Sequence, residues 1–223
     1  MLKKLALSGV ITHLLILVVI VLILFFTPQV SFSSILPPLP VATAGTWLYG
    51  WLSANPLLLK PLSIALLLVI SLLFNAMLIR HEVGLRSSLF PAVMTMLLML
   101  YTPDAIYLII TEVSLLLLMV SMHNILNLYG EQSPKYMILN ATMAVAVASM
   151  FIPELIVFTL FVWFGMFTYR INSWREWVIS ILGLLIPYIY LAFFYFWNDN
   201  LAFIIAVYEN YFRNWTFHMI KPA

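Results

Sequence analysis

Residues 170–188, RINSWREWVISILGLLIPY, decide the fold, because they join a short charged segment to a long apolar helix. Arg170, Arg175 and Glu176 crowd together here, and Trp174 and Trp177 bracket the last two of them. This mixture of charged and indole side chains is typical of the point where a membrane helix meets the lipid headgroups. The segment therefore predicts a membrane-spanning helix that starts at this hinge, with a glycine and a proline in its interior.

The composition extends this prediction to the whole chain. Of the 223 residues, 65% are hydrophobic and 8% are charged, whereas a soluble domain has about 25% charged residues. A soluble fold is therefore excluded. The net charge of +2 comes without a basic cluster, so we expect no nucleic-acid partner. The chain has no cysteine, which excludes disulfides, thiolate catalysis and cysteine metal sites.

Apolar segments separated by polar turns predict an all-α, polytopic bundle of about seven transmembrane helices, forming a single integral membrane domain over residues 1–223. The first apolar run is longer than the roughly 7–15 residues of a signal peptide, so it is interpreted as an uncleaved anchor. The predicted spans are residues 5–26, 61–79, 87–101, 105–127, 136–151, 154–169 and 177–197.

Two segments are predicted to lie on the outer surface of the membrane. Residues 27–59 carry no charge and are dense in proline, which prevents one continuous helix. Within them, residues 46–53 place two tryptophans and two leucines on one face, as in a short interfacial helix. Residues 201–217 carry polar side chains at helical spacing and predict a second interfacial, amphipathic helix.

The basic residues set the predicted orientation, because short inner loops are rich in Lys and Arg. An N-terminus inside the cell puts most of them on the inner face. One alternative stays open: residues 136–151 and 154–169 can form two complete spans or one re-entrant hairpin, since both arrangements leave the flanking basic residues on the same side. The residues predicted to be inside are Lys3, Lys4, Arg80, Arg86, Lys135, Arg170 and Arg175.

Glu112 is the strongest polar signal within a predicted span. It follows Asp104 by two helical turns and so lies about 12 Å deeper on a similar face. A carboxyl group at that depth is neutral, paired or in contact with water, and is a functional hypothesis by default. Two interpretations stay open: a proton or ion site, and a neutral acid that donates a hydrogen bond to a neighbouring helix.

The remaining candidate residues lie near the membrane surfaces. Arg170 and Arg175 can hold a phosphate, a lipid headgroup or a partner's carboxylate, or they simply obey the positive-inside rule while Glu176 caps the last span. Asp104 and Glu154 fall on the predicted outer face, where either can serve as a catalytic base. His81 and His123 belong to no metal-binding pair, so we expect no metal and no cofactor.

Residues 139–197 resemble a family of bacterial multi-span inner-membrane proteins whose function is unknown. The resemblance is carried by LNATMAVAVASMFIPELIVF at residues 139–158 and by the REW hinge followed by an LGLLxPY helix. Where the family pattern has an acidic residue and a glycine, this chain has Asn140 and Ala141. The resemblance implies a multi-pass protein of the bacterial inner membrane and supplies no activity. The matching residues are Ser149, Phe151, Pro153, Arg170, Arg175, Glu176, Trp177, Gly183 and Pro187.

Three functional hypotheses follow. Because the sequence holds no catalytic constellation, we expect a non-catalytic subunit or scaffold of a cell-envelope assembly, in contact with membrane lipids and with other envelope membrane proteins. The first alternative is a proton- or ion-coupled permease that uses Glu112. The second is an enzyme that acts on lipid-linked envelope sugars, with Asp104 or Glu154 as base and the arginines holding pyrophosphate.

Overall fold

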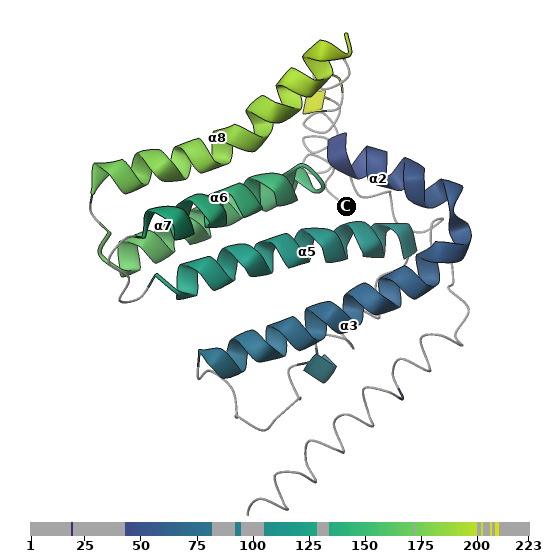
Figure 1. The fold of residues 1–223 in the computed structure, drawn as a ribbon, viewed down its shortest axis with the longest axis horizontal. Coiled ribbons are helices and arrows are strands. Elements are labelled where there is room, and N and C mark those ends of the chain that lie inside the picture. The colour runs from purple at the N-terminus through teal and green to yellow at the C-terminus, as the bar shows by residue number, and fades with distance from the viewer. Residues whose placement is uncertain are drawn as a thin grey trace, which may run out of the picture. The chain divides into compact units, whose positions relative to one another are not determined.

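The computed structural model describes residues 19, 43–81, 92–94, 105–128, 134–171, 173–199, 202, 206 and 208–209. Within these ranges the regular structure is helical, and no residue lies in a β-strand (Figure 1). The prediction of an all-α protein is therefore confirmed for this part of the chain.

The chain divides into two compact units, residues 1–39 with 49–116 and residues 40–48 with 117–223. In the first unit the described elements are the second half of α2 (Thr43–Ala54), α3 (Pro56–Arg80) and the first half of α5 (Ala105–Leu126). The second unit contains the remainder of α5, α6 (Lys135–Ser149), the 3₁₀ helix η1 (Pro153–Val157), α7 (Phe158–Thr168) and α8 (Trp174–Trp197).

Three of the described helices are long and apolar enough to cross a membrane: Leu57–Arg80, Leu108–Leu126 and Trp174–Trp197. They correspond to the second, fourth and seventh predicted spans. The fifth and sixth match α6, which has 15 residues, and the shorter apolar helix Pro153–Thr168. The first predicted span and, except for residues 92–94, the third lie outside the described residues. Seven spans and an inner N-terminus therefore remain predictions.

Helix α3 begins at Pro56, five residues before the predicted start at residue 61. Proline is well tolerated in the first turn, because the N–H groups there have no partner within the helix. The sequence prediction took Pro61 as a boundary, whereas the helix continues through it. At the other end Arg80 occupies the last turn, where a cation is favoured by the helix dipole.

Helix α2 contains the short helix predicted over residues 46–53, but its apolar face is divided. Leu52 is buried, whereas Trp47 and Trp51 are exposed. At its start, the Ala44 N–H donates to the carbonyl of Met150 at 3.1 Å, which joins α2 to the end of α6. The predicted helix over residues 201–217 lies largely outside the described residues.

Helix α6 is at the centre of the second unit and contacts η1, α7 and α8. One side of it is lined by small side chains, so that neighbouring backbones can approach closely, as is common between membrane helices. Helix α6 also contributes to an apolar core that includes residues of α5, of the turn after α5 and of α7. That core consists of Ile125, Leu128, Ile138, Ala141, Val145, Val162 and Met166.

Helices α6 and α8 run parallel, because residues later in α6 contact residues later in α8. Near the start of the pair, Gly183 lies against Thr142. One to two turns further on, the Tyr188 hydroxyl lies 2.7 Å from the Ser149 hydroxyl. Only Ser180, Gly183 and Pro187 of α8 are buried, so α8 uses one narrow face for this contact.

Helix α7 runs back alongside α6, and its only tryptophan links it to α8. The Trp163 indole N–H donates to the hydroxyl of the buried Ser180 at 2.8 Å. The rings of Trp163 and Trp177 lie 6.1 Å apart at 52°. On its opposite side α7 approaches α5 closely, because a Cβ atom at Gly165 would lie 2.6 Å from Ile125 Cγ2.

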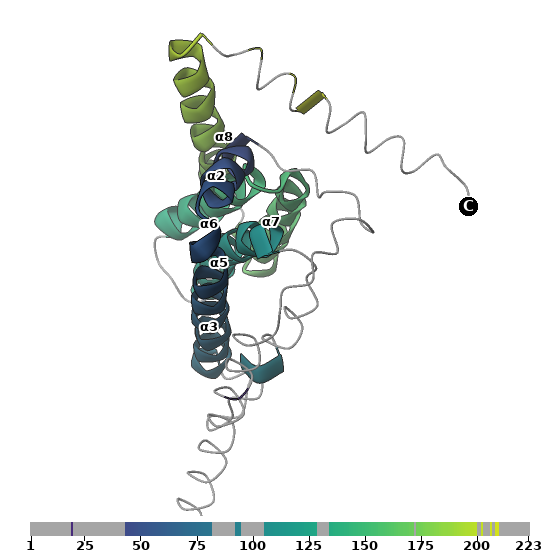
Figure 2. The same ribbon diagram turned by 90° about the vertical axis from the view of Figure 1, so that its right-hand side faces the viewer.

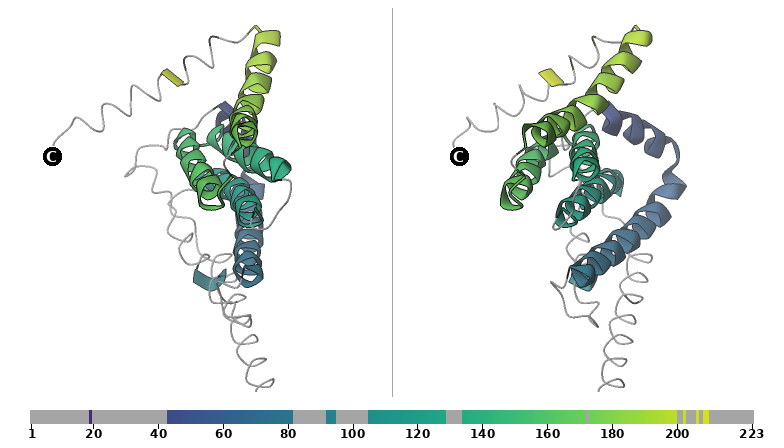
Figure 3. Two further views of the ribbon diagram at one scale, coloured as in Figure 1. Left: turned by 90° about the vertical axis from the view of Figure 1, so that its left-hand side faces the viewer. Right: turned by 60° about the vertical axis from the view of Figure 1, so that its left-hand side comes forward.

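Helix α8 extends past the end of α6. Its contact with Ser149 at Tyr188 leaves residues 189–197 beyond α6, a rise of about 13 Å at 1.5 Å per residue. Figure 2 shows this end of α8 rising beyond α6. The helix bends along its length (Figures 1 and 3), and it contains Pro187, a residue that favours a bend because it removes the bond to the carbonyl four residues earlier.

Candidate functional site

The turn between α7 and α8 is set by an unusual conformation at Arg170, which has a φ of 57°. The Arg170 N–H donates to the Phe167 carbonyl and the Ile171 N–H to the Met166 carbonyl, both at 3.0 Å. These two bonds form a Schellman cap, in which the left-handed position is normally glycine. The backbone itself therefore caps α7 and leaves the guanidinium of Arg170 free to interact elsewhere.

The start of α8 differs from the prediction. The helix begins at Trp174, three residues before the predicted residue 177, and Glu176 falls inside its first turn. The Ser173 side chain makes no capping hydrogen bond, and Glu176 Oε2 is buried without a hydrogen-bond partner among the described residues, so a capping role for Glu176 stays a prediction. Glu176 still lies at the positive end of the helix dipole, where a carboxylate is favoured.

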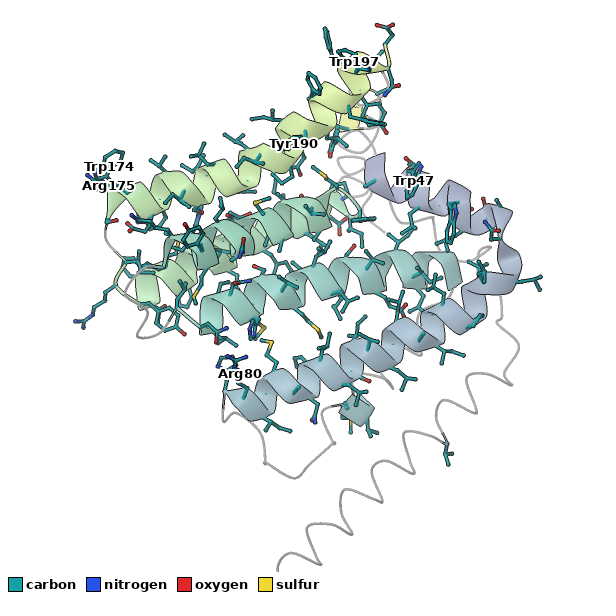
Figure 4. The ribbon with its side chains drawn as sticks, viewed as in Figure 1. Trp47, Arg80, Trp174, Arg175, Tyr190 and Trp197 are labelled. Carbon is teal, nitrogen blue, oxygen red and sulfur yellow. The ribbon has the colours of Figure 1, made fainter. Side chains whose placement is uncertain are left out.

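The predicted crowding of Arg170, Arg175 and Glu176 does not produce an ion pair among the described residues. Arg175 is exposed and lies beside Trp174 at the first turn of α8, with Trp197 at the opposite end (Figure 4). Arg170 instead lines an open pocket at the end of α7 with Phe164, Phe167 and Thr168. The hinge therefore separates its two arginines into different surroundings.

The pocket is amphipathic. Phe164 and Phe167 are 67% and 72% exposed, and they share one face of α7 with Thr168, because residues three and four apart are neighbours on a helix. The Thr168 hydroxyl donates to the Phe164 carbonyl at 2.8 Å, which leaves its oxygen able to accept. An apolar surface thus ends at a hydroxyl and a guanidinium.

Glu112 is the second candidate site, and the structure places it in the interior. Its side chain is 0% exposed, and neither carboxyl oxygen has a hydrogen-bond partner among the described residues. On the same helix, the buried Ser114 donates to the Ile110 carbonyl at 2.8 Å and is satisfied locally. A buried polar group without a partner is costly, so Glu112 is an outlier in its own helix.

Of the two candidate catalytic bases, Asp104 and Glu154, the structure describes only Glu154. Asp104 lies outside the described residues. Glu154 is exposed in the first turn of η1, at the opposite end of α7 from Arg170. The intervening helix separates them by about 24 Å at 1.5 Å per residue, so Glu154 and Arg170 cannot hold one pyrophosphate group together.

The contacts between helices were not found by sequence reasoning. The Trp163–Ser180 and Ser149–Tyr188 hydrogen bonds join side chains that sequence reasoning did not pair. The only signal for them is that Ser180, Gly183 and Pro187 recur at helical spacing. Among the described residues, no group of three or more His, Asp or Glu side chains is placed to hold a metal ion.

No protein-family model, curated protein or solved structure matches the chain. The resemblance to a bacterial inner-membrane family therefore stays a prediction.

Proposed function

We propose that the chain is a non-catalytic membrane subunit, a scaffold for an assembly of the bacterial cell envelope, in which α8 contacts another membrane protein. The observation that carries this proposal is the exposure of α8. It is long enough to span a membrane, yet only 17% of its most apolar window is buried. Lipid can cover such a surface, and so can the helix of a partner.

The composition of the far end of α8 favours a partner. Beyond Pro187 the exposed side chains are mostly aromatic, whereas aliphatic side chains dominate the exposed face before it. Large aromatic residues are enriched at protein interfaces, since they bury a large area at a small cost in entropy. The exposed aromatic residues are Tyr190, Phe193, Phe194, Phe196 and Trp197.

Site-specific photocrosslinking in cells tests this proposal. A photoreactive phenylalanine analogue at Phe193 is expected to give one discrete protein adduct. The same analogue at Leu72, an exposed apolar position of α3, serves as the control and is expected to give lipid adducts. Lipid adducts alone at Phe193 would overturn the proposal.

A second function, a proton- or ion-coupled permease, is favoured by one observation. Glu112 is wholly buried and has no hydrogen-bond partner for either oxygen among the described residues. A purely structural acid is normally satisfied by its neighbours, and an ionisable group within a span marks a transport path by default. Substitution of Glu112 distinguishes the two functions, as argued in the Discussion.

A further inference from the structure

We propose that the pocket at the end of α7 binds one anionic phospholipid, with its phosphate on Arg170 and an acyl chain along the exposed face of α7. The pocket is lined by Phe164, Phe167, Thr168 and Arg170. It combines an apolar surface with one cation at its end, which is the chemistry of a phospholipid. The site is independent of the partner proposed for α8.

The apolar part of the site is longer than the pocket itself. Leu160 and Phe161 are also exposed, and they lie one turn before Phe164 on the same side of α7. The exposed face from residue 160 to residue 168 therefore measures about 12 Å at 1.5 Å per residue. An acyl chain lying along this face covers the two phenylalanine rings that form its wall.

The polar part of the site is built around Arg170. Its backbone takes the left-handed conformation that favours glycine, and both hydrogen bonds of the cap come from backbone N–H groups. The side chain is thus not needed to end α7. A residue with a Cβ atom in this left-handed conformation also costs conformational energy. Among the described residues it forms no ion pair, so its guanidinium is available for a phosphate, to which it can donate two parallel hydrogen bonds.

The position of Arg170 along the chain matches the depth of a headgroup. It precedes the membrane-length helix α8 by four residues, and the intervening segment leads to the exposed Trp174. Tryptophan is enriched at the boundary between headgroups and hydrocarbon. A phosphate at Arg170 therefore lies at the level where lipids carry theirs. An acidic peptide fits less well, because the rest of the pocket offers it apolar side chains.

Lipid titration of the purified full-length protein, followed by native mass spectrometry, tests the site. Phosphatidylglycerol and phosphatidylcholine are the two probes. The wild type is expected to bind one phosphatidylglycerol at least fivefold more tightly than phosphatidylcholine. Arg170→Gly is expected to abolish this preference while keeping the fold, because glycine suits the left-handed position.

Arg175→Gln is the matched control, since it removes one exposed positive charge of the same hinge from outside the pocket. It is expected to keep the preference, and Arg170→Lys to weaken it by losing the bidentate contact. Phe167→Ala is expected to weaken the binding of both lipids to the same extent. If Arg170→Gly and Arg175→Gln lose this preference equally, the proposed site is wrong, and general surface charge explains the binding of the anionic lipid. Full displacement of the lipid by inorganic phosphate would overturn it in favour of a free-anion site.

Discussion

Gly183 of α8 lies directly against Thr142 of α6, so that a Cβ atom at residue 183 would overlap the Thr142 hydroxyl oxygen and lie 3.0 Å from the Leu139 carbonyl oxygen. The Thr142 hydroxyl bonds to the carbonyls of its own helix, Ile138 at 2.9 Å and Leu139 at 3.1 Å. It is therefore turned back onto α6, and the missing side chain of Gly183 is what lets the two helices meet.

Gly183→Ala is expected to destabilise the second unit by about 1–3 kcal/mol, the usual cost of overpacking a well-packed core. The added methyl group has no room unless α6 and α8 separate. The measurement is the thermal unfolding midpoint of the purified protein in detergent. Thr142→Ala removes the overlapping oxygen, so the double variant is expected to recover part of the loss.

Gly50 provides the control for this prediction. It also lies in a helix, but nothing stands within 4 Å of a Cβ atom placed there. Gly50→Ala is expected to be neutral or to stabilise the protein by up to ~1 kcal/mol, because alanine has the higher helix propensity. Equal effects at the two glycines would show that helix propensity, and not the contact with Thr142, governs residue 183.

The sequence predicted where the described helices lie better than it predicted which residues meet. Apolar runs and the absence of charge located α5 and α8 within a few residues, and they singled out Glu112 within a span and Gly183 within the last helix. Periodicity describes one helix at a time, however, so it could not predict that Gly183 contacts Thr142 on another helix. The hinge was misjudged for a related reason: nearness in sequence suggested one arginine cluster, but the left-handed turn at Arg170 ends one helix before another begins.

The hydrogen bond between Tyr188 and Ser149 is expected to couple α8 to α6. The Ser149 hydroxyl already donates to the Ala146 carbonyl at 2.7 Å, so Tyr188 is the donor of the 2.7 Å bond. A double-mutant cycle with Tyr188→Phe and Ser149→Ala is expected to give a coupling energy of about 0.6 kcal/mol, the average for such bonds in membranes. Unfolding free energies of all four proteins measure it, and additive losses would contradict the bond.

Removal of the Arg170 side chain is expected to stabilise the protein, whereas most substitutions destabilise a protein. Arg170→Gly is expected to stabilise the protein by about 0.5–1 kcal/mol, because it relieves the left-handed strain while the backbone cap remains. Arg170→Val is expected to destabilise it, since a β-branched side chain tolerates a positive φ poorly. Denaturant unfolding of the two variants checks this order. The reverse order would mean that the side chain, and not the backbone, ends α7.

The ends of α8 are expected to lie on opposite sides of the membrane. Because the chain has no cysteine, single cysteines can be introduced at Ser173 and Asn198, both exposed. With residue 173 inside, a membrane-impermeant thiol reagent is expected to label only Asn198→Cys in intact cells, and both variants after permeabilisation. Labelling of both sites in intact cells would show that α8 does not cross the membrane.

Glu112 decides between the two proposed functions. In a scaffold, Glu112 does not need to gain or lose a proton for the protein to function. Glu112→Gln keeps the shape and polarity of the side chain, so this variant is expected to preserve abundance and to complement a deletion strain. A coupled permease must instead bind and release a proton or an ion at this position, which an amide cannot do.

Glu112→Met separates a structural role from a functional one. Because neither oxygen has a hydrogen-bond partner among the described residues, replacing the buried acid by an apolar side chain of similar size is expected to remove a desolvation cost of ~1–3 kcal/mol. The variant should therefore unfold at a higher temperature than the wild type. If Glu112 is only structural, both variants complement. If both variants fold and accumulate normally but fail to complement, the scaffold proposal is wrong and transport through Glu112 takes its place. A less stable Glu112→Met would instead show that the carboxyl group has a partner in the folded protein.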